Sequence, residues 1–170
     1  MISLNAIFKH NVPQLFTPKW LKRLTYFTPT ETLKWLAEQR LNVLFKAQIQ
    51  AGELDFLRHQ SVCIEVRNLP LFLFVSLDGT TLQVIVVKSP FVATYMMRCD
   101  GKLSGDSDSF LELIAGHCDP DTLFFRRKLS IAGDTELCFT FKNWLDTQDP
   151  AGLIPASVYQ SIQHYVAQQA

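Results

Sequence analysis

The chain has 170 residues, of which 16 are basic and 16 acidic, so its formal net charge is zero. A neutral chain lacks the basic excess that general nucleic-acid binding requires, and no nucleic acid is expected as a partner. The length suits one domain with extensions. Phe is abundant at 13 residues, and such a surplus of rings either fills a core or lines a cavity for a long apolar molecule.

The cysteines and the apolar runs indicate the cellular compartment in which the protein is found. Cys63, Cys99, Cys118 and Cys138 are widely spaced and form no C-x-x-C pair, which is typical of reduced thiols in a cytosolic protein. The first residues lack a continuous apolar stretch and a small-residue cleavage site, so no signal peptide is predicted. The longest apolar run, 69–77, is about half a membrane span. We therefore expect a cytoplasmic protein.

Residues 1–29 are interpreted as an N-terminal extension. They show no clean period and are broken by prolines. Basic and aromatic residues interleave in this segment, and such a pattern could rest on an anionic membrane surface. The alternative is that the rings pack on the domain. The candidate membrane or headgroup contacts in this extension are Lys19, Trp20, Lys22 and Arg23.

A long helix is predicted next. Thr28-Pro29-Thr30-Glu31 has the form of a capping box with a proline in the first helical position. Apolar residues then recur at helical spacing from Leu33 to Phe45, and Gly52 marks the far end.

The middle of the chain is predicted to be β. Residues 62–67 alternate apolar and polar side chains, as a half-buried strand does. Two apolar runs, 71–77 and 82–88, flank the turn sequence Asp78-Gly79-Thr80-Thr81, which indicates a hairpin buried on both faces. Residues 93–99, ATYMMRC, are predicted to form a further strand.

Strand and helix then alternate. Residues 102–116 and 128–146 each predict a short strand, a turn and an amphipathic helix, and 155–170 predict a final helix with Val158, Ile162, Tyr165 and Val166 as its apolar stripe. The expected class is α+β, a mainly antiparallel twisted sheet with helices covering one face. The expected organisation is 1–29 extension, 30–148 domain and 149–170 C-terminal helix.

Motifs for chemistry are weak. Asp134 and Glu136 occupy the turn that a phosphate would need, and their charges would repel it. No G-x-S-x-G, H-E-x-x-H or Walker pattern occurs, and His117-Cys118-Asp119 fits a polar loop better than a metal site. We predict no enzyme and no metal, with an enzyme based on Asp134, Glu136 or His117 as the third alternative.

Residues 110–146, FLELIAGHCDPDTLFFRRKLSIAGDTELCFTFKNWLD, resemble the C-terminal half of the sterol carrier protein 2 (SCP2) domain. Members typically show a helix that ends in Gly, an apolar turn, and a strand that leads through Gly-Asp into an apolar helix. The matching positions here are Gly116, Leu123 to Phe125, Lys128 to Ile131, Gly133 and Asp134. Cys138 departs from the pattern, since many relatives have glycine there. The resemblance spans roughly residues 30–147.

The resemblance implies a twisted sheet and helices that enclose a hydrophobic tunnel for sterols, acyl chains or isoprenoids, without a cofactor. The stretch FFRRKLSIAGDTEL resembles the bacterial stand-alone branch of this family, whose members are accessory lipid carriers in ubiquinone biosynthesis, including its oxygen-independent route. It therefore implies a non-enzymatic carrier of a polyprenylated quinone precursor, with ubiquinone-biosynthesis enzymes or accessory proteins as partners. Burying each CH₂ of such a tail gains about 0.8 kcal/mol.

Candidate lipid-lining residues are taken from the apolar faces of the predicted elements. They are Phe72, Phe74, Val84, Val86, Phe110, Ile114, Phe124, Phe125, Leu137, Phe141 and Trp144. Plain core packing is the alternative for each of them. Arg126, Arg127 and Lys128 are candidates for headgroup or membrane contact, or else a solvated strand end. Alternative functions are an SCP2-like interaction subunit and a general sterol or fatty-acyl carrier.

Overall fold

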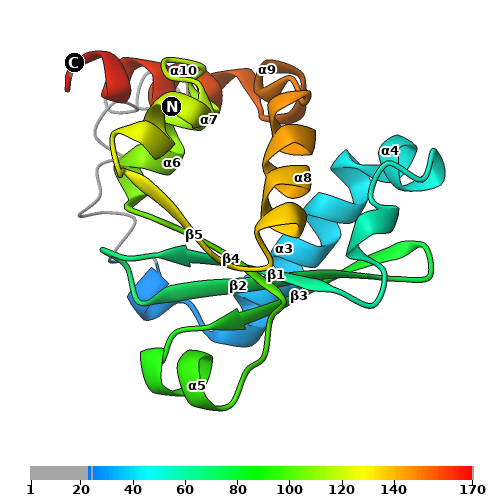
Figure 1. Cartoon of the computed structure of the whole chain (residues 1–170). Helices are drawn as coiled ribbons and strands as arrows, with labels where there is room; N and C mark the ends of the chain where they lie inside the picture. The colour runs from blue at the N-terminus through cyan, green and yellow to red at the C-terminus, as the bar shows by residue number, and fades with distance from the viewer. Residues whose placement is uncertain (1–22, 24, 170) are drawn as a thin grey trace, which may run out of the picture.

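The computed structural model describes residues 23 and 25–169, which form a five-stranded sheet flanked by helices (Figure 1). The strands are β1 (Ser61–Val66), β2 (Leu71–Asp78), β3 (Thr81–Val87), β4 (Gly101–Gly105) and β5 (Leu129–Gly133). Their order is β3-β2-β1-β4-β5, and every neighbouring pair is antiparallel except β1 and β4. The predicted α+β class with a mainly antiparallel sheet is confirmed.

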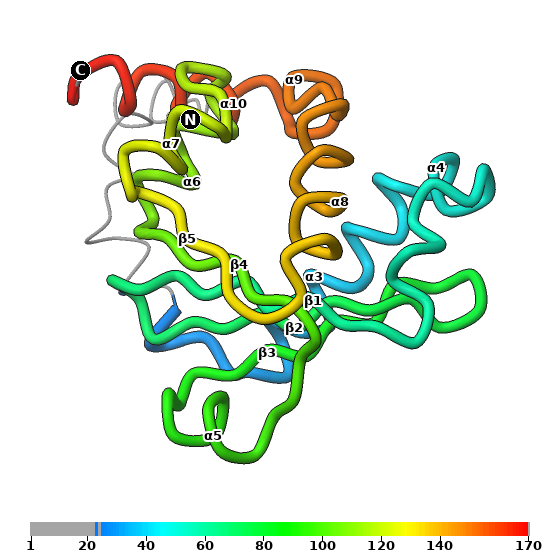
Figure 2. The backbone as a smooth tube through the Cα atoms, viewed as in Figure 1, coloured from blue at the N-terminus to red at the C-terminus, as the bar shows by residue number. Residues whose placement is uncertain are grey.

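The helices divide between the two sides of the sheet. Those described are α3 (Thr30–Leu44), α4 (Lys46–Gln50), the 3-10 helix η2 (Asp55–Leu57), α5 (Pro90–Tyr95), α6 (Ser107–Ile114), α7 (Pro120–Phe125), α8 (Thr135–Asp146), α9 (Pro150–Leu153) and α10 (Ala156–Ala167). Helices α6 to α10 lie on one side of the sheet, and α5 lies on the other (Figures 1 and 2). We refer to the face toward α8 as the first face and to the face toward α5 as the second.

The main core lies on the first face. Alternate residues of three strands, including Val62, Val75 and Leu82, point toward Leu137 and Phe141 of α8. Residues of α4 and η2 complete this cluster, which buries aliphatic and aromatic side chains almost fully. The burial of apolar side chains in such a close-packed core is the main contribution to the stability of a small domain.

The second face carries a smaller cluster. Cys63, Phe72, Phe74 and Val87 point to this side and pack with Ala93 of α5. The predicted two-faced burial of the hairpin is confirmed for β2, which buries Phe72 and Phe74 on one side and Val75 and Leu77 on the other. It is wrong for β3, an edge strand whose second face is exposed at Gln83 and Ile85.

The predicted strand at residues 93–99 is wrong. Pro90 to Tyr95 form α5 instead, and residues 97–99 are irregular. The Ser89 Oγ accepts a hydrogen bond from the Val92 amide at 3.4 Å, and Pro90 takes the first helical position. These two residues start a helix, because the cap satisfies an amide that would otherwise lack a partner and proline fixes φ in the helical range.

Helix α3 covers the outer edge of the sheet. The Asn42 side chain donates to the Leu82 carbonyl at 2.8 Å and accepts from the Leu82 amide at 2.7 Å, while Glu38 accepts from the Val84 amide at 3.0 Å. Edge strands left unpaired invite association with other chains, so these contacts protect β3.

The start of α3 differs from the predicted capping box. Pro29 is the N-cap rather than the first helical residue, and it makes no side-chain cap hydrogen bond, because proline has no polar side-chain atom. The helix ends at Leu44, after which α4 continues, and Gly52 adopts φ +78° where the helical region was predicted to end.

Two glycines allow close backbone approaches at β4. A Cβ on Gly101 would lie 2.6 Å from the Cys138 Sγ, so α8 packs directly on this strand. Gly133 has φ +78°, and a Cβ there would lie 2.4 Å from the Asp100 carbonyl oxygen. Glycine is therefore required for steric reasons at position 133, the first residue of the Gly-Asp turn.

The C-terminal helix packs on α6, as its apolar stripe predicted. Ile162, Tyr165 and Val166 bury themselves against Leu111, and the Tyr165 hydroxyl donates to Asp108 at 3.0 Å. None of the helices within the described part of the chain is long and apolar enough to cross a membrane.

Replacing Gly133 with alanine tests the crowded turn. We expect Gly133→Ala to lower the free energy of unfolding by about 1–2 kcal/mol for the left-handed backbone and by a further 1–3 kcal/mol or so for the clash with Asp100. Gly79→Ala is the matched control, since Gly79 also has positive φ but no atom lies within 4 Å of its Cβ position. Urea unfolding measures both variants, and equal losses would contradict the steric account.

Candidate functional site

A pocket of about 570 Å³ lies between the second face of the sheet and the segment that carries α5. Its lining consists of Ser61, Cys63, Phe72, Phe74, Ala93, Thr94, Met97, Arg98, Cys99, Asp100 and Lys102. The volume falls within the range of about 300–1,000 Å³ that is typical of small-molecule sites. Because Thr94, Arg98 and Asp100 are exposed, the pocket opens to solvent on their side.

Chain topology places this pocket. Strand β3 lies at one edge, and β4 lies beyond β1 and runs parallel to it. Residues 88–100 must therefore cross over β2 and β1, and they do so on the second face. The strands form the floor of the pocket, and the crossover segment forms its wall.

The floor is apolar, and the rim is polar and charged. Phe72 and Phe74 supply buried rings to the floor, and Ala93 and Met97 add aliphatic surface from the wall. Two cations, Arg98 and Lys102, stand at the rim. An apolar floor with a cationic rim suits an amphiphile whose polar head carries oxygen atoms.

The rim charges differ in how they are held. The Lys102 Nζ lies 2.7 Å from the Glu65 carboxylate and 5.9 Å from the centroid of the Phe72 ring. The Asp100 carboxylate accepts from the Ser61 amide at 2.7 Å. Within residues 25–169 no carboxylate forms an ion pair with Arg98, which leaves its guanidinium as the most available cation of the rim.

Two thiols line the pocket and are held in the neutral form. Burial, together with the neighbouring Cys99, raises the pKa of Cys63 from 9.0 to about 12. Burial also raises the pKa of Cys99, against the opposing effect of Lys102. The thiolate is the nucleophilic form of cysteine, so these side chains contribute apolar surface rather than reactivity at neutral pH.

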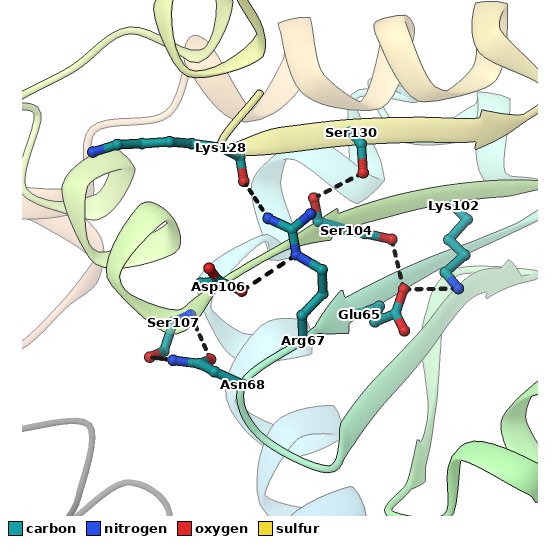
Figure 3. A network of polar contacts seen from close by, with 9 residues as sticks. All are labelled: Glu65, Arg67, Asn68, Lys102, Ser104, Asp106, Ser107, Lys128 and Ser130. Carbon is teal, nitrogen blue, oxygen red and sulfur yellow. Dashed lines mark hydrogen bonds and ion pairs between the residues drawn. The ribbon is translucent and has the colours of Figure 1, made fainter. Parts of the chain in front are cut away.

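A polar network borders the pocket on the second face (Figure 3). Glu65 accepts from Lys102 and from the Ser104 hydroxyl, both at 2.7 Å. Partial burial would raise the pKa of Glu65, but these hydrogen bonds outweigh it and hold the pKa below its usual value. A separate ion pair follows these strands, with the Arg67 guanidinium 3.2 Å from Asp106. Between β1 and β4, therefore, an ion pair takes the place of the apolar floor.

The predicted lining residues separate into different places. Phe72 and Phe74 line the pocket, whereas Val84 and Val86 point to the first face, because neighbouring side chains of a strand alternate in direction and the register aligns these valines with Val75 and Leu73. The predicted set therefore does not surround one cavity.

The helical members of that set lie away from the pocket. Leu137, Phe141 and Trp144 belong to the first-face core, and Ile114 packs on the C-terminal helix cluster. The Phe110 ring lies near Gly105, and Phe124 stacks on Phe139 with centroids 6.2 Å apart. Phe125 is 89% exposed and encloses nothing.

The predicted headgroup cations are not at the mouth of this pocket. Arg126, Arg127 and Lys128 precede β5, whose first residue pairs with Gly105, whereas the pocket lies at the opposite end of β4, near Lys102. Lys128 forms an ion pair with Glu112, in which its Nζ lies 2.7 Å from the Glu112 Oε1. Arg23 is exposed, and Lys19, Trp20 and Lys22 lie outside the described residues.

The residues of the enzymatic alternative have structural positions. Asp134 caps α8 by accepting from the Leu137 amide at 3.0 Å, Glu136 is exposed in the first turn, and His117 is exposed after Gly116. Across the described ranges no three His, Cys, Asp or Glu side chains converge in a way that could hold a metal ion.

Sequence reasoning missed most of the pocket wall. Thr94, Met97, Arg98 and Cys99 fall in the segment that was predicted to be a strand, and their common position follows only from the crossover. The Ser89-Pro90 pair was the available signal, since a cap residue followed by proline indicates a helix start.

The comparisons with known proteins agree with this architecture. A family model described as the SCP-2 sterol transfer family matches residues 39–146. The ubiquinone biosynthesis accessory factor UbiT of Escherichia coli (strain K12) is 35% identical over 129 residues, which are 76% of this chain and 69% of UbiT, and UbiT of Escherichia coli O157:H7 matches equally. The solved UbiJ-SCP2 ubiquinone synthesis protein has a TM-score of 0.55 at 14% identity and is similar over 70% of this chain and 93% of its own.

The raised thiol pKa predicts how stability depends on pH. In the unfolded chain Cys63 loses its proton near pH 9, but in the folded protein it does so only near pH 12. Its contribution to stability is therefore complete below pH 9 and is lost as the pH rises toward 12. Urea unfolding between pH 8 and 11 should show a shallower loss for Cys63→Ala than for the natural chain. Equal slopes would mean that Cys63 titrates normally.

Proposed function

The chain belongs to the SCP-2 sterol transfer family, and on that premise we propose that it is a non-enzymatic carrier which holds an apolar lipid in the pocket beneath α5. The proposed cargo is a polyprenylated quinone precursor, and the proposed process is ubiquinone biosynthesis, including its oxygen-independent route. The proposed carrier domain spans residues 30–148, with 1–29 and 149–170 as additions to it, and acts in the cytoplasm.

One observation carries the proposal: the pocket combines an apolar floor with a cationic rim. Phe72, Phe74 and Met97 would contact the isoprenoid part, at about 0.8 kcal/mol for each buried CH₂. Arg98 and Lys102 would contact the oxygen atoms of the aromatic head. A pocket of 570 Å³ accommodates a head and the first isoprene units, so the remainder of a long tail would leave through the opening at Thr94.

The side chains around the cargo support carriage rather than chemistry. The Cys63 thiol remains protonated at physiological pH. Asp100 is engaged by the Ser61 amide, and Lys102 is engaged by Glu65. The reactions on the cargo would then belong to partner enzymes, which fits the description of the Escherichia coli relatives as accessory factors.

Helix α3 supports a second candidate function, that of an interaction subunit. Trp35, Leu36 and Val43 are exposed on this helix. Exposed aromatic and aliphatic residues of this kind are typical of protein–protein contacts. The two functions are compatible, because a carrier has to meet the enzymes that use its cargo.

Blocking the pocket mouth tests the carrier function. Thr94 is exposed and lines the pocket, so Thr94→Trp should fill the opening without unfolding the domain. We expect binding of a farnesylated phenol, followed by native mass spectrometry, to weaken about tenfold or more, or about 1.4 kcal/mol. Thr140→Trp is the matched control, since Thr140 is exposed on α8 away from the pocket.

The outcomes separate the candidates. Unchanged binding by Thr94→Trp would move the cargo site to another part of the fold. If the natural chain binds neither farnesylated phenol nor sterol nor fatty acid, the carrier proposal fails and the interaction subunit remains. Binding of sterol or fatty acid alone would favour the general lipid carrier.

A further inference from the structure

The outer side of α5 is as apolar as its inner side. Phe91, Tyr95 and Met96 are 61%, 75% and 68% exposed, although Ala93 on the same helix is buried against the sheet. Phe91 and Tyr95 are one helical turn apart, and their ring centroids lie 5.0 Å from each other. We call these three exposed apolar residues, Phe91, Tyr95 and Met96, the α5 patch.

The α5 patch lies directly outside the pocket. Thr94 lies between Phe91 and Tyr95 in the sequence of α5, and it lines the pocket. Met97 and Arg98, just after the end of the helix, also line it. In Figures 1 and 2, α5 projects from the sheet on the side opposite α6 to α10. A flat surface could therefore meet α5 without meeting those helices.

The charged residues that flank α5 most closely in the sequence are both cations, and the nearest carboxylate, Asp100, accepts a hydrogen bond from the Ser61 amide. Residues 79–99 contain no Asp or Glu, and their only charged residues are Lys88 and Arg98, one on each side of α5. Lys88 donates to the Thr28 carbonyl, which leaves its charge uncompensated, and Arg98 is exposed. Helix α3, which also exposes aromatic and aliphatic residues, instead mixes acids and bases along its length.

Exposed rings with flanking cations match the chemistry of an anionic lipid surface. Aromatic and Met side chains enter the boundary between headgroups and acyl chains, while Lys and Arg stay among the phosphates. Such cations are attracted to the negative surface potential of anionic lipids. A protein partner would be recognised by specific hydrogen bonds at the rim of the patch, whereas the two charged residues that flank α5 most closely, Lys88 and Arg98, are both cations.

We propose that α5 is the element through which this protein docks on an anionic lipid bilayer, so that the pocket mouth at Thr94 opens at the membrane interface. Phe91, Tyr95 and Met96 enter the interface, and Lys88 and Arg98 contact lipid phosphates. The cargo then moves between bilayer and pocket without crossing open water, where the exposure of its apolar tail is unfavourable. This inference rests on the proposed carrier function.

Vesicle co-sedimentation of the full chain tests the docking. We expect it to sediment with vesicles of phosphatidylcholine mixed with phosphatidylglycerol, and to bind less to phosphatidylcholine alone or at high salt. The double variant Phe91→Ser/Tyr95→Ser should lower the partition coefficient about tenfold or more. Met96→Glu, which adds a repelling charge, should act in the same direction. Trp35→Ser/Val43→Ser, on the exposed side of α3, is the matched control and should stay within about twofold of the natural chain.

These measurements distinguish the membrane-docking proposal from the carrier function on which it rests. Farnesylated-phenol binding in vesicle-free solution should be unchanged in Phe91→Ser/Tyr95→Ser, because neither residue lines the pocket. Intact cargo binding without vesicle binding by the natural chain would overturn the docking alone. Loss of vesicle binding in the α3 variant but not in the α5 variants would also overturn it. If sedimentation velocity shows a dimer that the α5 variants dissociate, and vesicles do not bind, the patch is a contact between two copies.

Discussion

The crossover from β3 to β4 is the constraint on which the site depends. Because β4 lies beyond β1 and parallel to it, the chain between these strands has to pass over two strands of the sheet. It passes on the second face, where it covers Cys63, Phe72 and Phe74 with a helix of six residues. Such a short element covers part of the face and leaves a pocket beside it. The apolar floor, the cationic rim and the exposed rings of α5 all follow from this one connection.

The two faces of the sheet serve different purposes. The first face is packed against α4, η2 and α8, and its side chains are almost fully buried. The second face has an apolar part under α5 and a polar part between β1 and β4, where Glu65, Lys102 and Ser104 form a network. The polar part ends the pocket on that side, since ionic side chains do not favour an apolar cargo. A rigid first face thus holds a second face that remains available for binding.

Much of the fold could be predicted from the sequence, because the pattern of apolar residues agrees with the local structure. The hairpin around Gly79, the strand–turn–helix at Gly133 and the C-terminal stripe at Tyr165 are examples. Three short helices could not be predicted from periodicity, because four to six residues are too few to show a helical repeat. Ser89-Pro90, Asp119-Pro120 and Asp149-Pro150 start these helices with a side-chain cap, and this pair of residues was the usable signal.

The site was harder to predict than the fold. Phe72 and Phe74 could be found as apolar strand residues, but so could Val84 and Val86, which point to the opposite face. With both sides of the hairpin apolar, the sequence cannot indicate which side is left open until the crossover is placed. The rim cations Arg98 and Lys102 are also distant from the Arg-Arg-Lys run that begins at residue 126. That run was predicted to contact a headgroup because it has three consecutive cations, but Lys128 forms an ion pair with Glu112.

The most direct measurement of the central claim is the identity of the lipid that the protein carries. The chain would be purified from a bacterial host without detergent, extracted with organic solvent and analysed by mass spectrometry against a mock purification. The account predicts enrichment of polyprenylated phenols or quinones at about one molecule for each pocket beneath α5. Phospholipid or fatty acid alone would remove the quinone assignment. A protein that is empty and takes up no added isoprenoid would contradict the account.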